Sequence, residues 1–399
     1  MSETNDLLRG ELERLFEPDE MTTLALELMG YTATELGDPD GKGAFARALV
    51  DRCEADDALE ALADAMTLFG KAARTAKIFE SRAGRGLEPG EELGGFKVRK
   101  SVGGGGLGDV YLAERGDGDE KVRVALKVIR SSVSRDPSAV ARFLTGQRGF
   151  KRAKIAGVAP VHGCGRLADG RPWVATEYVD GQTLASRIER VGPMHFNEAR
   201  PVFRGVLSAL QALHDGGLVH ADVKSANVFV VRPTAKDGSR GEPTGVLVDG
   251  GAHRLLAAGA TRPDAIGALR VFGNAQAIAP EMALGGSIDA ASDIYAVGVM
   301  LYEVLTGKVP FTGDSAFEVI AKHIDTIPAA PSEIAPKGWV HKDVDALVLQ
   351  ALAKDPADRF GSARELLSAL DALAKPKKEK DLDPKALEKA AAALEKELK

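Results

Sequence analysis

Two short stretches of this 399-residue sequence carry the side chains that phosphate chemistry needs. Residues 220–227 read His-Ala-Asp-Val-Lys-Ser-Ala-Asn and contain Asp222, Lys224 and Asn227, while Asp249 lies further on, in Val-Asp-Gly-Gly. A carboxylate can orient an attacking hydroxyl, a lysine can neutralise phosphate charge, and an amide with a second carboxylate can hold Mg²⁺. The pattern therefore predicts phosphoryl transfer, with Asp222 and Lys224 as catalytic residues and Asn227 and Asp249 as metal ligands.

A glycine-rich segment upstream is suited to holding a nucleotide triphosphate. Glycines at this spacing expose backbone N–H groups to phosphate oxygens and bring no Cβ to obstruct them. A dinucleotide-binding fold would need a helix directly after the glycines, whereas a strand pattern follows here. The predicted nucleotide-binding residues of this segment are Val102, Gly103, Gly105, Gly108 and Val110.

The motifs that follow one another along the chain resemble those of bacterial, eukaryotic-like Ser/Thr protein kinases. Residues 220–227 resemble the catalytic loop of that family. Three later segments resemble further family motifs in the same order: 279–281 (Ala-Pro-Glu), 292–298 (Ser-Asp-Ile-Tyr-Ala-Val-Gly) and 354–360 (Lys-Asp-Pro-Ala-Asp-Arg-Phe). The resemblance covers roughly residues 91–375.

This resemblance implies ATP and Mg²⁺ as cofactors and a protein Ser or Thr hydroxyl as acceptor. It assigns Lys127 to the α and β phosphates, and it places the adenine ring between Val110 and Ala125. The backbones of Glu177 and Val179 would meet the edge of that ring.

The resemblance also assigns residues to the support of the site. Glu281 and Arg359 are expected to form a structural ion pair, and Asp293 is expected to brace the backbone of the catalytic loop.

Four positions depart from the family pattern. By spacing, Gly146 occupies the place of the small-lobe helix glutamate that pairs with the lysine, so only Asp249 across the cleft is left to orient Lys127. Gly250 replaces the Phe that links the metal-binding Asp to that helix. The other two departures are Ala221 for Arg and Asn274 for Thr.

Two hypotheses about function stay open. The complete chemical set favours a Ser/Thr protein kinase of reduced or atypically regulated activity. The lost positions favour a pseudokinase that acts as a signalling scaffold. Because Thr261 is the only Ser or Thr between Asp249 and Glu281, phosphorylation of this loop is not expected to be the switch.

The predicted fold class is α+β: a bilobal protein-kinase-like fold preceded by a small all-α helical bundle. Its divisions are residues 1–80 (bundle), 81–92 (linker rich in Gly, Pro and charge), 93–375 (kinase-like domain) and 376–399 (charged helical tail). Strand patterns include 122–129, and helical periodicity dominates after residue 185.

The helical bundle at residues 1–80 has two interpretations. Segments 8–16 and 46–54 resemble the death-fold-like effector-associated modules of bacterial multidomain proteins. Such a module would recruit a helical partner. The alternative is a helical extension that only packs on the next domain.

Composition excludes several classes of function. The net charge of −6 argues against nucleic acid as the main partner. The two cysteines, Cys53 and Cys164, show no metal-binding spacing and suggest a reducing compartment, so a cytoplasmic location is expected. We expect no signal peptide and no membrane span, and the apolar segment 294–301 is predicted to be a buried helix.

Overall fold

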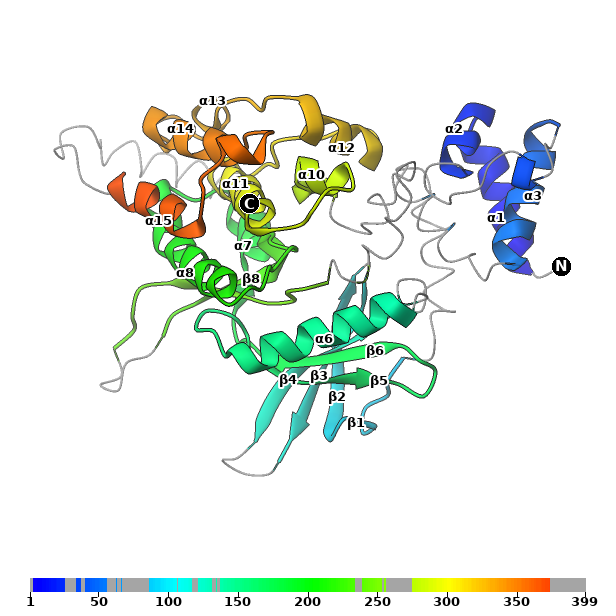
Figure 1. The fold of residues 1–399 in the computed structure, drawn as a ribbon, viewed down its shortest axis with the longest axis horizontal. Coiled ribbons are helices and arrows are strands. Elements are labelled where there is room, and N and C mark those ends of the chain that lie inside the picture. The colour runs from blue at the N-terminus through cyan, green and yellow to red at the C-terminus, as the bar shows by residue number, and fades with distance from the viewer. Residues whose placement is uncertain are drawn as a thin grey trace, which may run out of the picture.

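A computed structural model (Figure 1) describes residues 3–25, 34–36, 40–55, 62, 66, 86–105, 107–116, 121–130, 134, 137–233, 239–252, 255 and 275–373. The predictions that concern Thr261, Asn274 and the tail from residue 376 lie outside these residues.

The small lobe is built on one six-stranded antiparallel sheet with strand order β1-β2-β3-β4-β6-β5. Its strands are β1 (Glu92–Leu93), β2 (Phe96–Gly105), β3 (Gly108–Arg115), β4 (Val122–Ile129), β5 (Val161–Arg166) and β6 (Pro172–Glu177). Helix α6 (Pro137–Ala153) lies along this sheet in Figure 1. Strand β4 buries Val124, Leu126 and Val128 on one face, which is the alternation that its sequence predicts.

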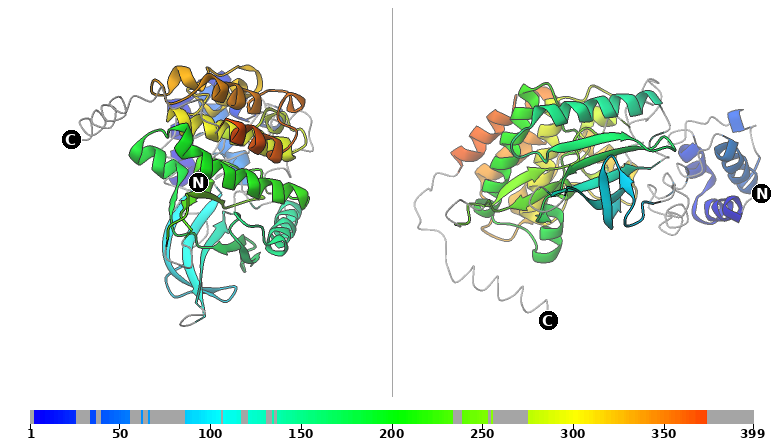
Figure 2. Two further views of the ribbon diagram at one scale, coloured as in Figure 1. Left: turned by 90° about the vertical axis from the view of Figure 1, so that its left-hand side faces the viewer. Right: turned by 90° about the horizontal axis from the view of Figure 1, so that it is seen from below.

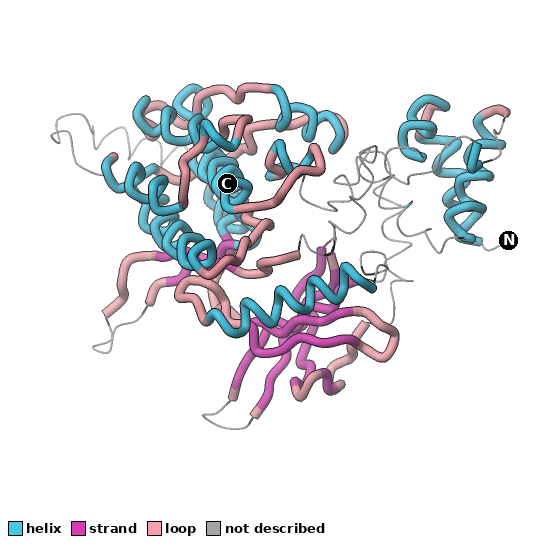
Figure 3. The backbone as a smooth tube through the Cα atoms, viewed as in Figure 1, coloured by secondary structure: helices cyan, strands magenta, loops and turns pink. Residues whose placement is uncertain are grey.

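The large lobe is mostly helical, as Figure 3 shows by colour. Its helices are α7 (Leu184–Val191), α8 (Phe196–Asp215), α10 (Pro280–Ala283), α11 (Ala290–Thr306), α12 (Ala316–Asp325), α13 (Pro331–Ile334), α14 (Lys342–Ala351) and α15 (Ala363–Ala372). The left-hand view of Figure 2 shows these helices grouped above the cyan strands of the six-stranded sheet.

The predicted buried helix at residues 294–301 is confirmed as the middle of α11. Every residue from Ser292 to Tyr302 is buried there, and Asp289 caps the N-terminus with a reciprocal capping box. No helix in the described ranges combines the length and apolar character needed to cross a membrane.

A three-stranded sheet lies beside the catalytic loop. Strands β7 (Gln182–Thr183), β8 (Val228–Val231) and β9 (Thr244–Leu247) pair in this order. Strands β8 and β9 form a hairpin in which Val231 lies opposite Thr244. Because Asn227 directly precedes β8 and Asp249 follows β9, the hairpin brings the two predicted metal ligands to the same end.

Three helices and a short 3₁₀ turn are described near the N-terminus: α1 (Glu3–Leu15), α2 (Pro18–Thr23), α3 (Lys42–Ala55) and η2 (Thr34–Leu36). Helix α2 begins at Pro18, with a capping box between Glu17 and Glu20. Leu8, Leu12 and Phe16 share a buried cluster with Leu49 and Val50. The rest of the predicted bundle, residues 56–80, lies outside the described residues except for Leu62 and Met66.

Candidate functional site

The catalytic loop, residues 220–227, is held by a carboxylate from the start of α11. Asp293 accepts hydrogen bonds from the backbone N–H of His220 at 2.9 Å and of Ala221 at 2.6 Å. The ring of His214 on α8 lies 2.9 Å from the same carboxylate. Ala221 adopts a left-handed conformation (φ 56°), which non-glycine residues seldom adopt. The prediction that Asp293 braces this loop is therefore confirmed.

Asp222, Lys224 and Asn227 form one cluster within the loop. The Lys224 Nζ atom lies 2.9 and 3.0 Å from the two carboxylate oxygens of Asp222. The Asn227 side-chain amide donates to Oδ2 of Asp222 at 2.7 Å and to its backbone carbonyl at 2.9 Å. Both Asp222 and Asn227 are buried, so their orientation is fixed by these contacts.

Lys127 on β4 contacts Asp249, which follows β9. The distance from Lys127 Nζ to Asp249 Oδ2 is 2.5 Å, and both side chains are mostly buried. Burial of Asp249 would raise its pKa, but the positive charges of Lys127 and Lys224 act in the opposite direction and hold the pKa below its ordinary value. Asp249 itself is left-handed, with φ 64°.

The glycine hairpin, residues 103–108, joins β2 to β3 and covers the cleft. Gly105 is paired with Gly108 at its tip. A Cβ at Gly108 would lie only 2.0 Å from the carbonyl oxygen of Val128 on β4. Glycine is therefore required at this position for β3 to approach β4 closely.

A cavity of about 440 Å³ lies beneath this hairpin, within the usual range for ligand sites. Its wall includes eight of the nine predicted nucleotide-binding residues, namely Val102, Gly103, Gly108, Val110, Ala125, Lys127, Glu177 and Val179. The four residues predicted for catalysis and metal binding, Asp222, Lys224, Asn227 and Asp249, line the same cavity.

Several lining residues were not predicted from the sequence: Gly104, Leu107, Tyr178, Thr183, Ala226, Phe229 and Val248. Phe229 and Val248 each lie within two residues of a predicted metal ligand. Their apolar character next to Asn227 and Asp249 was the only signal available in the sequence.

A second cavity, of about 30 Å³, lies behind Lys127 and Thr176. Its wall includes Phe150 and Gln147 of α6. A volume of this size is enough to hold an ordered water molecule.

Helix α6 brings no carboxylate to Lys127 from position 146. Gly146 is buried, and the neighbouring Gln147 points to the cleft instead. The Gln147 side-chain amide donates to the carbonyl oxygen of Gly250 at 2.8 Å. The expectation that Asp249 alone is left to pair with Lys127 agrees with the 2.5 Å contact.

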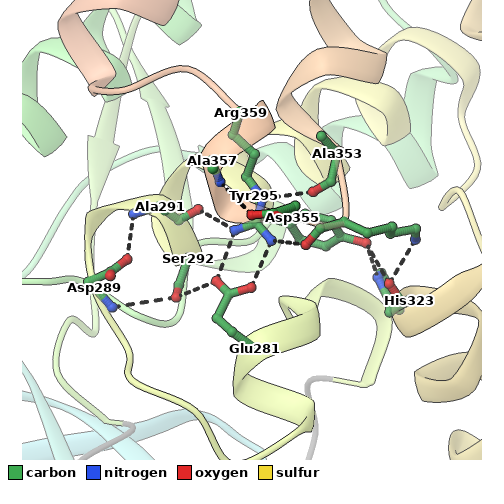
Figure 4. A network of polar contacts seen from close by, with 11 residues as sticks. Glu281, Asp289, Ala291, Ser292, Tyr295, His323, Ala353, Asp355, Ala357 and Arg359 are labelled. Atoms are coloured by element: carbon green, nitrogen blue, oxygen red, sulfur yellow. Dashed lines mark hydrogen bonds and ion pairs between the residues drawn. The ribbon is translucent and has the colours of Figure 1, made fainter.

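A network of polar contacts centred on Glu281 and Arg359 lies within the large lobe (Figure 4). Arg359 donates two hydrogen bonds to Glu281, at 2.9 and 2.7 Å, and its side chain is fully buried. Ser292 also donates to Glu281, at 2.7 Å. Burial alone would raise the pKa of Glu281, but these donors hold it below its ordinary value. The predicted ion pair is thus present and lies in the lobe interior, supporting structure.

The same network continues to a buried histidine. The hydroxyl of Tyr295 lies 2.8 Å from Nδ1 of His323. The ammonium of Lys354 donates to the His323 carbonyl at 2.7 Å and lies 4.6 Å from the centre of the Phe311 ring. Burial, followed by the Lys354 charge, lowers the pKa of His323 to about 3. This network therefore holds a histidine in an environment that opposes its protonation.

Comparisons with known proteins agree with this geometry. The family model described as "Protein kinase domain" matches residues 96–370. The Ser/Thr protein kinase PknB of Mycobacterium tuberculosis is 35% identical over 280 residues, which cover 69% of this chain and 42% of PknB. The Ser/Thr protein kinase pkn3 of Myxococcus xanthus is 33% identical over 300 residues, which cover 75% of this chain and 53% of pkn3.

A solved structure shares the fold. The crystal structure of the M. tuberculosis PknI kinase domain matches with a TM-score of 0.55 and 25% identity, covering 72% of this chain and 99% of that domain. The match to PknB and pkn3, in contrast, spans only part of their length. From the converged side chains, the cavity and the matched residues 96–370, we conclude that the chain belongs to the protein kinase domain family.

Proposed function

We propose that this protein transfers the γ-phosphoryl group of ATP to Ser or Thr hydroxyls of proteins, with reduced or atypically regulated activity. The observation that carries the proposal is the convergence of Lys127, Asp222, Lys224, Asn227 and Asp249 on one cavity. These five side chains come from β4, the catalytic loop and the end of β9. They supply the cations, the acceptor-orienting carboxylate and the metal ligands that phosphoryl transfer requires.

The nucleotide would occupy the cavity of about 440 Å³. Val110 and Ala125 lie on its wall and would enclose the adenine ring between them. The backbones of Glu177 and Val179 would contact the edge of the ring. The glycine hairpin would offer its N–H groups to the phosphates, and Lys127 would balance their charge.

Mg²⁺ is the ion that protein kinases generally use, and two side chains here fit it. The amide nitrogen of Asn227 is taken by Asp222, which leaves its oxygen as a ligand. Asp249 uses Oδ2 for Lys127, which leaves Oδ1. When bound, Mg²⁺ would neutralise phosphate charge. Within the described ranges no group of three His, Cys, Asp or Glu side chains could bind a metal, so phosphate oxygens would complete the ligand set.

Asp222 would orient the acceptor hydroxyl and take its proton as the new O–P bond forms. The bond to the ADP oxygen breaks in the same displacement, and Lys224 would balance the charge of the transferred group. The Lys224 and Asn227 contacts to Asp222 hold this carboxylate in one orientation before the acceptor arrives.

A signalling pseudokinase is the second candidate, and one specific observation favours it. Lys127 and Asp249 pair with each other at 2.5 Å, so nucleotide and metal would have to compete with this ion pair for both side chains. As a pseudokinase the protein would recruit partners through residues 1–80, which are proposed as a helical adaptor module. A linker (81–92), a kinase domain (93–375) and a charged tail (376–399) are proposed to follow it. Cys53 and Cys164 are both among the described residues and are not joined in a disulfide, which supports a reducing compartment such as the cytoplasm.

The deciding experiment compares phosphate transfer from γ-labelled ATP by wild type and by Asp222→Asn. We expect wild-type autophosphorylation or transfer to a general protein substrate, and loss of at least ~10²-fold in the variant. Asp215→Asn is the matched control, because Asp215 is an exposed aspartate at the end of α8 whose side chain contacts Gln211 and Arg364 and not the catalytic loop. Equal labelling by wild type and Asp222→Asn, or no labelling by either, contradicts the kinase proposal.

The scaffold alternative has its own measurement. A thermal-shift titration with ATP and Mg²⁺ separates a nucleotide-binding scaffold from one that binds none, because ligand binding stabilises the native state only where it occurs. For the adaptor module, capture of a helical partner by the full chain but not by a chain lacking residues 1–80 supports recruitment. A monomeric, partnerless chain that loses stability on the same deletion supports packing instead.

A further inference from the structure

Two glycines follow Asp249, and an aromatic ring from α6 lies against both. A Cβ at Gly250 would lie 2.8 Å from Cε1 and 2.8 Å from Cζ of Phe150, closer than real Cβ atoms approach. A Cβ at Gly251 would lie 3.1 Å from Cε2 of the same ring. Phe150 is 7% exposed and belongs to the main hydrophobic core. The ring therefore fills the space next to Gly250, where a side chain of that residue would otherwise lie.

The backbone of Gly250 does not itself require glycine. Left-handed φ values occur at Gly251 (80°) but not at Gly250. The nearest atoms that exclude a side chain at Gly250 are those of the Phe150 ring, followed by Cδ2 of His220 at 3.2 Å. Sequence alone indicates that the link between α6 and the metal-binding segment is lost at Gly250. The structure instead shows that the linking side chain comes from the helix: the ring of Phe150 on α6 reaches the loop at Gly250.

A second contact also joins α6 to the glycines that follow Asp249. Gln147 lies three residues before Phe150, on the same buried face of α6, and is 4% exposed. Its amide donates to the carbonyl oxygen of Gly250 at 2.8 Å. The same nitrogen would lie 3.3 Å from a Cβ at Gly251. The Phe150 ring and the Gln147 amide thus both hold the Gly250-Gly251 segment against α6.

These contacts complete the support of a strained residue. Asp249 is left-handed, and such a conformation persists only where its surroundings enforce it. From the large lobe, Val248 donates to the Asn227 carbonyl at 3.0 Å, and its own carbonyl lies 3.0 Å from Nε2 of His220. Gly251 donates to the His220 carbonyl at 2.8 Å. The contacts from α6 act on the same short segment.

We propose that Phe150 and Gln147 are positioning residues that hold Asp249 in place from α6. They take over the role of a side chain at position 250 and connect the helix to the carboxylate that pairs with Lys127. The catalytic consequence of this proposal rests on the proposed function, whereas the packing relationship does not.

A reciprocal exchange tests the proposal. Phe150→Ala removes the ring, Gly250→Phe adds a ring that meets the existing one, and the double variant moves the ring from helix to loop. Each single variant is expected to lower kcat about a hundredfold, because a small displacement of Asp249 misplaces the metal site. Each is also expected to raise the Mg²⁺ concentration needed for half-maximal rate. The double variant is expected to recover kcat to within about tenfold of wild type.

Phe143→Ala is the matched control, since Phe143 is a buried aromatic on the same helix and none of the nearest atoms to Gly250 belongs to it. Its loss should reduce thermal stability without a rescue by Gly250→Phe. The proposal is overturned if the Phe150→Ala/Gly250→Phe variant is no better than the worse single variant. It is equally overturned if Phe143→Ala changes the Mg²⁺ requirement as much as Phe150→Ala does.

Gln147→Met provides a second test of the proposal if the Gly250→Phe variant does not fold. Methionine preserves the volume but cannot donate to Gly250, so kcat should fall by up to about tenfold, with the KM for peptide unchanged. An unaltered kcat and Mg²⁺ requirement would contradict the role of the amide. If wild type binds Mg²⁺ and ATP without transferring phosphate, the proposed function fails, and the exchange is judged by the Mg²⁺ dependence of the ATP-induced thermal shift. If wild type transfers phosphate and every variant matches it, only the positioning role fails.

Discussion

Lys127 and Asp249 form an ion pair across the cleft, with 2.5 Å between Nζ and Oδ2. Lys127 belongs to the small-lobe sheet and Asp249 follows a large-lobe strand, so the pair joins the two lobes directly. Gly146 on α6 supplies no competing carboxylate. The cation expected to meet phosphate therefore also orients the carboxylate expected to meet the metal, and both tasks depend on one contact.

Lys127→Met should weaken ATP binding and lower phosphate transfer by about 10²-fold, since a cation that stabilises charge in the transition state is lost. It should also raise the pKa of Asp249, because Lys127 holds that pKa down. The pH midpoint of Mg²⁺-dependent ATP binding is then expected to move upward, and titration calorimetry across pH measures it. Lys121→Met is the control, because Lys121 pairs with Glu114 on the surface. An unchanged midpoint would argue against the coupling.

Gly108→Ala should loosen the glycine hairpin from β4. Its Cβ would meet the Val128 carbonyl at 2.0 Å, and overpacking against backbone costs about 1–3 kcal/mol. A Cβ at Gly104 would meet chiefly the movable side chain of Asp109, at 2.9 Å. Gly104→Ala is therefore expected to cost less. Urea unfolding and ATP affinity measured on both variants check the order, which would be reversed if contact with backbone were not the cause.

The sequence predicted most of the site and less of its support. The glycine hairpin, Lys127 and the catalytic loop were predicted because their spacing is local and tied to strand and loop patterns. Strand β5 was not predicted, because His162-Gly163-Cys164-Gly165 lacks the β-branched alternation that marks a strand.

The part of the site that sequence reasoning missed is long-range packing. The sequence shows that Gly250 lacks a ring, but not that Phe150, one hundred residues earlier, supplies one to the same space. Similarly, Gln147 belongs to no sequence motif. Only the 2.8 Å hydrogen bond to Gly250 shows that its side chain reaches the segment after Asp249. Such compensation between distant residues requires coordinates to be seen.

His323 should make the protein sensitive to acid. Its pKa is lowered to about 3 from an ordinary 6.5, so the stability held by the neutral ring is complete above pH 6.5 and is lost as pH falls toward 3. The facing charged or titratable groups are Lys354 and Tyr295. Between pH 6.5 and pH 5 the free energy of unfolding is expected to fall by about 2 kcal/mol, because each pH unit in this range contributes about 1.4 kcal/mol.

Denaturant unfolding of wild type and His323→Asn at pH 7, 6 and 5 measures this effect. The variant is expected to be less stable at pH 7 but to lose less stability on acidification. Phe311→Leu is the control, because it removes a neighbouring ring without removing a titrating group. If His323→Asn and wild type lose equal stability between pH 7 and 5, the buried histidine is not the cause.

Arg359→Met should destabilise the large lobe by about 3–5 kcal/mol, because Glu281 would remain partly buried without its bidentate partner. Replacing Glu281 as well, in Glu281→Met/Arg359→Met, should recover part of the loss. Thermal and urea unfolding of the two single variants and the double variant measure the coupling. Strictly additive losses would mean that the two side chains do not stabilise each other.

The origin of the ring beside Gly250 also bears on small-molecule selectivity. The cavity of about 30 Å³ behind Thr176 has Phe150 in its wall, and that ring is carried by α6, whose backbone is hydrogen-bonded along its length. A compound that extends into this cavity cannot gain room by rotating a loop residue outward, because position 250 has no side chain to rotate. It must displace the Phe150 ring from the main hydrophobic core instead, which makes extended inhibitors costly and favours compounds confined to the adenine end of the larger cavity.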